Sequence, residues 1–155
     1  MPLSGVITSG KLINIQNANL QSTHSANPLA CAAGSITLDE IKRLKLTSRA
    51  KKLGKVFEKY LDQIAKKYDQ CVKLVTYKGL IGAIIFKNFK KIQAKKIADT
   101  VSKRCLKYGL LVCNTNRNSI KFGPPLVIKK EDLIKSMKIV MECIEEFLRE
   151  NVKKY

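Results

Sequence analysis

Residues 20–29 read Leu-Gln-Ser-Thr-His-Ser-Ala-Asn-Pro-Leu, and they gather hydroxyl side chains, an imidazole and the start of a helix. Asn27 followed by Pro28 is typical of a helix start, because asparagine can cap the first N–H groups and proline loses no hydrogen bond there. The sequence therefore predicts a helix from Pro28 to about Leu44. Hydroxyls and backbone N–H groups at the positive end of a helix dipole can together hold a phosphate. An ordinary cap and turn is the alternative interpretation.

Beyond this stretch, hydrophobic periodicity predicts the remaining elements. The helix from Pro28 is Ala-rich, which favours close packing, and we expect it to be mostly buried. Helices on one face of a small, mainly antiparallel sheet follow from the order of elements, so the expected fold class is α/β (α+β). The further helices are expected at about 48–68, 92–107 and 130–151, and the strands at 3–7, 72–77, 80–86, 110–113 and 119–122.

The chain is strongly basic. Its 155 residues include 30 Lys and Arg against 12 Asp and Glu, a formal net charge of +18. Such an excess attracts polyanions, so nucleic acid and anionic membrane surfaces must be considered as partners. The sequence shows no RNA-binding aromatic motif, no zinc-finger spacing and no Arg-rich run. We favour the simpler interpretation, in which lysines occupy the solvated faces of helices, and we keep a polyanion partner as the alternative.

The cysteines and the apolar runs of the sequence indicate the cellular compartment of the protein. The five cysteines form no C-x-x-C pair, and the single histidine leaves no partner for a zinc site. An odd number of cysteines argues against a disulfide framework and favours a reducing compartment. The longest apolar run, Leu80–Phe86, is too short to span a bilayer, and the start of the sequence lacks a targeting pattern. We therefore expect a cytoplasmic protein with no metal and no membrane anchor.

Four segments, in order along the chain, resemble one enzyme family. They are Pro2-Leu3-Ser4-Gly5-Val6-Ile7, the run from Ser22 to Ala33, Lys78-Gly79-Leu80-Ile81-Gly82, and Gly123-Pro124-Pro125-Leu126-Val127-Ile128. They resemble class III aminotransferases, the pyridoxal-phosphate enzymes of fold type I, and in particular the 4-aminobutyrate, acetylornithine and ornithine aminotransferase group. In that family the first two segments are the strand and the loop that follow the cofactor lysine.

The resemblance implies a carboxy-terminal fragment. Family members are considerably longer, and the lysine that forms the Schiff base lies a few residues before the segment that begins at Pro2. Residues 1–27 are then expected to be a remnant of the large cofactor-binding domain, and residues 28–155 the linking helix and the small carboxy-terminal domain. Such a chain would hold no catalytic residue and should be inactive alone. A split gene, a decayed gene and a truncated chain all remain open.

The resemblance also assigns site residues. Thr23 aligns with the threonine whose hydroxyl and backbone N–H bind the cofactor phosphate across a dimer interface, and Ser22 is its companion. Lys121 stands where many members carry the arginine that binds the substrate α-carboxylate. A lysine offers the charge without the bidentate fork, so an outward-facing surface lysine is the alternative. His24 is interpreted as structural, and no metal ligand is predicted.

The function that the resemblance implies is transfer of an amino group between an amino acid or amine and a keto acid, with pyridoxal 5'-phosphate as cofactor. The intact enzyme would be a homodimer, or a separate chain would supply the missing part. The alternative function is a non-enzymatic basic protein that binds nucleic acid or another polyanion. Strong, salt-sensitive binding to DNA or RNA would favour that alternative.

Overall fold

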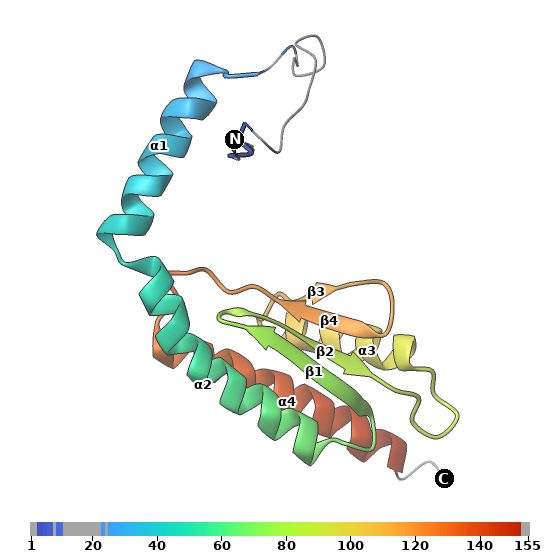
Figure 1. The fold of residues 1–155 in the computed structure, drawn as a ribbon. Coiled ribbons are helices and arrows are strands. Elements are labelled where there is room, and N and C mark those ends of the chain that lie inside the picture. Colours follow the sequence, from blue (N-terminus) through green and yellow to red (C-terminus); the bar gives the residue numbers. More distant parts are fainter. Residues whose placement is uncertain (1–2, 8, 11–22, 24, 153–155) are drawn as a thin grey trace. The chain divides into compact units, whose positions relative to one another are not determined.

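A computed structural model describes residues 3–7, 9–10, 23 and 25–152 (Figure 1). The chain divides into two compact units, Met1–Lys45 and Leu46–Tyr155, and each is described by itself. In the first unit the described element is α1 (Pro28–Arg43). The second unit contains α2 (Leu46–Lys67), β1 (Val72–Lys78), β2 (Ile81–Phe86), α3 (Ala94–Lys107), β3 (Cys113–Asn114), β4 (Ser119–Phe122) and α4 (Lys130–Val152). The predicted boundary after residue 27 concerns the domains of a longer parent, and it stays a prediction.

Helix α1 begins as the sequence predicts. The Asn27 side chain accepts hydrogen bonds from the backbone N–H groups of Leu29 (3.1 Å) and Ala30 (3.2 Å), and Pro28 occupies the first turn. The expected burial of this helix is wrong, because Ala30 is its only buried residue and apolar side chains such as Ile36 are 65% exposed. Among its described residues the first unit provides no second helix or strand against which an Ala-rich face could pack.

The predicted strand at residues 3–7 is also wrong. These residues form neither helix nor strand, and Val6 and Ile7 are almost fully exposed. An apolar segment becomes a strand only when a neighbouring strand accepts its backbone hydrogen bonds. The strands that the structure describes all belong to the second unit and pair with one another.

The second unit is built on a four-stranded antiparallel sheet with strand order β1-β2-β4-β3. Helices α2, α3 and α4 cover one face of this sheet, as predicted (Figure 1). The buried side chains of Ile84 and Ile120 point to the helices, and the exposed side chains of Ile81 and Lys121 lie on the other face. The predicted strand at 110–113 is shorter than expected, because Leu110 donates its N–H to Cys105 at the end of α3.

The core lies between the sheet and the three helices. Side chains at helical spacing on α2, α3 and α4 are completely or almost completely buried against the inner face of the sheet. Phe57 of α2 meets Phe122 of β4 edge to face, with ring centroids 6.1 Å apart. The main contributors are Phe57, Leu61, Ile64, Ile84, Phe86, Ile97, Val101, Ile120, Leu133, Met137, Val140 and Ile144.

The closest approach in this packing is between two glycines. A Cβ atom added at Gly54 of α2 would lie 2.8 Å from the Cα atom and 2.9 Å from the carbonyl oxygen of Gly79, in the turn between β1 and β2. Gly79 has φ +58°, a backbone conformation that other L-residues rarely adopt, so the turn itself also depends on glycine. The helix can therefore lie this close to the turn only if position 54 has no side chain.

Substitution of Gly54 by alanine should destabilise the chain. In an open helix this change stabilises by about 1 kcal/mol through helix propensity, but overpacking against a backbone costs about 1–3 kcal/mol. We expect the free energy of unfolding in urea to fall for Gly54→Ala and to stay nearly unchanged for Lys52→Ala on the exposed side of the same helix. A Gly54→Ala chain more stable than the parent would contradict the close packing.

Candidate functional site

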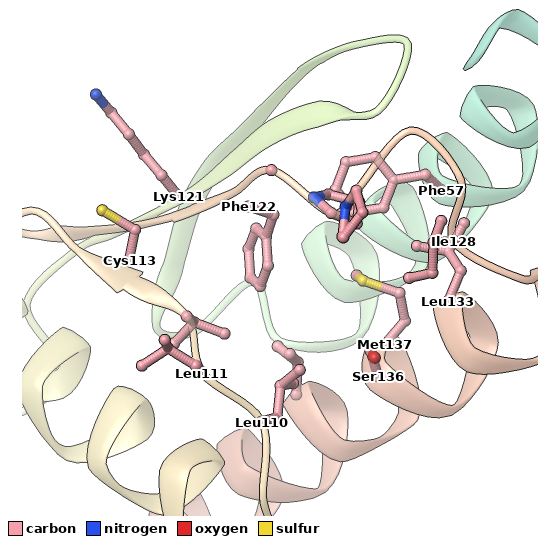
Figure 2. Close-up of a pocket in the computed structure, with 15 residues that line it drawn as sticks. Phe57, Leu110, Leu111, Cys113, Lys121, Phe122, Ile128, Leu133, Ser136 and Met137 are labelled. Atoms are coloured by element: carbon pink, nitrogen blue, oxygen red, sulfur yellow. The ribbon is translucent and has the colours of Figure 1, made fainter. Parts of the chain in front are cut away.

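Lys121 lies in β4, between β2 and β3, on the face of the sheet that the helices do not cover. It is directly opposite Ala83 on one side and Cys113 on the other. Residues paired in this way place their side chains on the same face. In Figure 2 the side chains of Lys121 and Cys113 point in the same direction. The Lys121 amine is exposed and forms no hydrogen bond or ion pair with any described residue, so it is available to an anion.

The chain just after Lys121 is held in place from the opposite side of the sheet. Phe122 points inward, toward Phe57 (Figure 2). The Gly123-Pro124-Pro125 turn then ends the strand, because proline cannot donate to the ladder. Arg49 of α2 donates to three successive carbonyl oxygens beyond the turn, those of Leu126 (3.2 Å), Val127 (3.4 Å) and Ile128 (2.6 Å). These contacts hold the connection that follows β4, while the Phe57–Phe122 contact holds the end of the strand itself.

A pocket of about 480 Å³ lies beneath this end of the sheet. Its size is within the range of small-molecule sites, but its lining is almost wholly apolar. The hydroxyl of Ser136 donates to the Asp132 carbonyl (2.8 Å), and the Lys121 amine points away from the cavity. Cys113 and Lys121 also line the pocket at its edge, but both side chains point to the open face of the sheet, so the interior offers mainly apolar contact. Its other lining residues include Phe57, Leu110, Leu111, Val112, Phe122, Pro124, Pro125, Ile128, Leu133, Met137 and Val140.

Thr23 is an exposed turn residue in the first unit, while Ser22 and His24 lie outside the described residues. The N–H groups at the start of α1 are already bonded: Asn27 accepts from Leu29 and Ala30 through its side chain, and from Cys31 through its carbonyl. A phosphate would therefore have to bind at the turn itself and not at the helix end. The Thr23 hydroxyl has no hydrogen-bond partner among the described residues, so this donor fits a phosphate oxygen.

The two predicted binding positions belong to different units. The first unit holds Thr23 and the second holds Lys121, and the fold of each unit places only its own residue. Sequence reasoning missed Arg49, which binds the connection after β4 and for which the sequence gives no signal, and Cys113, which pairs with Lys121. Cys113 could have been found, because a short strand that pairs with Ser119–Phe122 places it beside Lys121.

Other groups in the described part of the chain do not form a site. Burial raises the pKa of Cys71 to about 11 and raises the pKa values of Cys105 and Cys143, so these thiols stay protonated and inert. No cluster of His, Cys, Asp or Glu within the described residues could hold a metal ion. None of the helices within residues 25–152 combines the length and the apolarity that a bilayer crossing requires.

A sheet covered on one face by three helices also occurs in a solved aminotransferase. The acetylornithine aminotransferase of Elizabethkingia anophelis matches 85% of this chain with a TM-score of 0.74 and 34% sequence identity, and the match covers 32% of that protein. The fold is thus that of a fragment of a fold type I aminotransferase.

The sequence comparisons agree. The model of the family described as aminotransferase class-III matches residues 1–144, and the chain belongs to this family. Ornithine aminotransferase of Schizosaccharomyces pombe is 31% identical over 149 residues, which are 94% of this chain and 32% of that protein. Acetylornithine aminotransferase of Caldanaerobacter subterraneus is 27% identical over 94% of this chain and 35% of its own length. The chain thus spans about a third of the length of these relatives, and the predicted family resemblance is confirmed.

Thiol labelling of the native chain checks the open face of the sheet. All five cysteines are free, and only Cys31 and Cys113 are exposed. Because the thiolate is the reactive form, we expect a colorimetric disulfide reagent to modify these two rapidly at neutral pH and the other three only after unfolding. Replacing Cys113 by serine should leave one rapid thiol. Rapid reaction of three or more thiols in the native chain would contradict the described burial.

Proposed function

We propose that this chain is the carboxy-terminal part of a pyridoxal-phosphate-dependent aminotransferase, which transfers an amino group between an amino acid or amine and a keto acid. The observation that carries the proposal is the family match over residues 1–144. The structural likeness to an acetylornithine aminotransferase supports it. Relatives named ornithine and acetylornithine aminotransferases favour donors that carry a carboxylate. The five free cysteines favour a reducing compartment such as the cytoplasm.

In this proposal the first unit contributes to the cofactor site of a homodimer. Pyridoxal 5'-phosphate supplies the stabilisation of the carbanion when it is bound. The Thr23 hydroxyl donates to a phosphate oxygen, and Ser22 is its companion. The support from the structure is the exposed position of the Thr23 hydroxyl, which no described residue engages. Since the Asn27 cap occupies the N–H groups at the start of α1, the turn carries the phosphate contact.

The second unit contributes the substrate contact. The ammonium group of Lys121 stands on the open face of the sheet without an acidic partner among the described residues, so an incoming carboxylate can bind to it. A lysine binds a carboxylate as a point charge, whereas an arginine would bind through two parallel hydrogen bonds. We therefore propose that Lys121 attracts the substrate carboxylate with less directional control than an arginine would give.

The chain alone should not transaminate. By resemblance to the family, the Schiff-base lysine lies before the segment that begins at Pro2 and outside these 155 residues. We expect no transamination by the purified chain with pyridoxal phosphate, ornithine and 2-oxoglutarate. Co-expression with the amino-terminal two thirds of an acetylornithine aminotransferase should give a complex that retains the cofactor on gel filtration. Transamination by the purified chain alone, at the rate expected of an intact enzyme, would refute this proposal.

Conservative and disruptive variants within that complex test the two contacts separately. A hydrogen bond to a charged group contributes about 1.5–3 kcal/mol, so Thr23→Ala should weaken cofactor binding at least about tenfold in equilibrium dialysis. Thr23→Ser, which keeps the hydroxyl, is the matched control. Lys121→Gln should raise KM for the amino acid donor by a similar factor, while Lys121→Arg should not. Unchanged cofactor affinity in Thr23→Ala would exclude the phosphate role.

A further inference from the structure

The positive charge of the second unit is unevenly distributed. Residues 87–107, which form the loop after β2 and helix α3, contain eight basic residues and one acidic residue, Asp99. Helix α4, by contrast, carries six acidic and four basic residues. The simple expectation of lysines scattered evenly over the helix surfaces therefore does not describe the molecule. The basic residues of this segment are Lys87, Lys90, Lys91, Lys95, Lys96, Lys103, Arg104 and Lys107.

Among the described residues, the acidic groups near α3 engage Arg104 and Asn114 and form no ion pair with the four lysines of that helix. Glu146 and Glu150 of α4 form ion pairs with Arg104. Asp99 accepts a hydrogen bond from the side-chain amide of Asn114 (2.7 Å). All seven lysines of the segment are exposed. Within residues 25–152 no ion pair engages the four lysines of α3 itself, Lys95, Lys96, Lys103 and Lys107.

Helix α2 provides a contrast within the same unit. Its two acids, Glu58 and Asp62, lie among Lys55, Lys59 and Lys66 around one surface groove. At three or four residues apart such side chains are neighbours on a helix. A seventh basic residue of this helix, Lys67, pairs with Glu145 of α4. Asp99 of α3 lies at the same spacing from Lys95, Lys96 and Lys103, so the two helices differ in the number of acids, two on α2 and one on α3.

Three lysines of α3 lie on one side of the helix and Lys95 lies about 100° from Lys96 around the axis; we call Lys95, Lys96, Lys103 and Lys107 together the lysine face. The steps of seven and four residues from Lys96 place the last three on one side, about 10 Å and about 6 Å apart along the axis. Lys95 and Lys96 stand in the first turn, which holds no acidic residue, and the N-cap Gln93 makes no side-chain cap. Positive charge at this end of a helix opposes the dipole, so the arrangement does not serve helix stability.

We propose that the lysine face binds the phosphate backbone of a nucleic acid without sequence preference. A row of exposed amines on a rigid helix matches a polymer of phosphates, and release of counterions drives such binding. An anionic membrane fits less well, because a helix that lies on a membrane presents a free apolar face. The apolar face of α3 is instead buried in the core, where Ile97, Val101 and Cys105 are completely inaccessible. The proposal does not depend on the aminotransferase function.

The test is a titration of the full 155-residue chain with a fluorescein-labelled 24-base-pair DNA duplex, followed by anisotropy from 50 to 200 mM NaCl. If four phosphates are neutralised, the logarithmic salt slope should be about −3.6, a loss of about 150-fold in affinity over this range. A variant with Lys95, Lys96, Lys103 and Lys107 all replaced by glutamine should bind at least about 30-fold more weakly at 50 mM NaCl, with a slope near zero.

The matched control removes the same number of charges from α2, with Lys52, Lys55, Lys59 and Lys66 replaced by glutamine, and it should stay within about threefold of the parent. Equal losses in the two variants would mean that only net charge matters and would overturn the proposal. So would tighter binding to phosphatidylserine vesicles than to the duplex. Amide chemical shifts of the unmodified chain provide a test without variants: addition of DNA should perturb α3 and not α2, and the reverse pattern would overturn the proposal.

Discussion

The close contact between α2 and the sheet determines most of the second unit. Gly54 meets the Gly79 turn, and a Cβ atom at Gly82 would lie 2.8 Å from the side chains of Phe57 and Leu61. Because these glycines have no side chains, α2 can pack close to the sheet. Phe57 then reaches the ring of Phe122 and fixes the end of β4. The direction of Lys121, the next residue back along the strand, thus depends on small residues that carry no chemistry.

Because the helices cover only one face, the sheet separates two surfaces with different physical character. The covered face supplies the core and the apolar pocket, and the open face carries exposed side chains such as Lys121 and Cys113. A half-covered sheet is stable when its outward residues tolerate water. In a class-III aminotransferase fragment of about a third of the full length, the open face is where we propose that a substrate carboxylate meets the chain.

The sequence predicted those elements whose partners lie within the second unit. The apolar stripes of α2 and α4 and the strands at 72–78 and 81–86 follow from periodicity, because each packs on residues of the same unit. The strand at 3–7 and the burial of α1 were wrong, since periodicity shows that a face is apolar but not what covers it. The predicted binding roles of Thr23 and Lys121 came from family resemblance alone. The lysine face could not be predicted, because it depends on which acids lie near α3 in space.

The contact between Arg49 and the three carbonyls of residues 126–128 has an evolutionary consequence. The guanidinium binds backbone oxygens, which every amino acid provides, so the side chains of this connection are free to change without loss of the contact. The length of the connection is constrained, because an inserted or deleted residue would move the carbonyl oxygens away from the Arg49 donors. Among descendants of this chain, the connection should therefore drift in sequence while remaining constant in length for as long as Arg49 is retained.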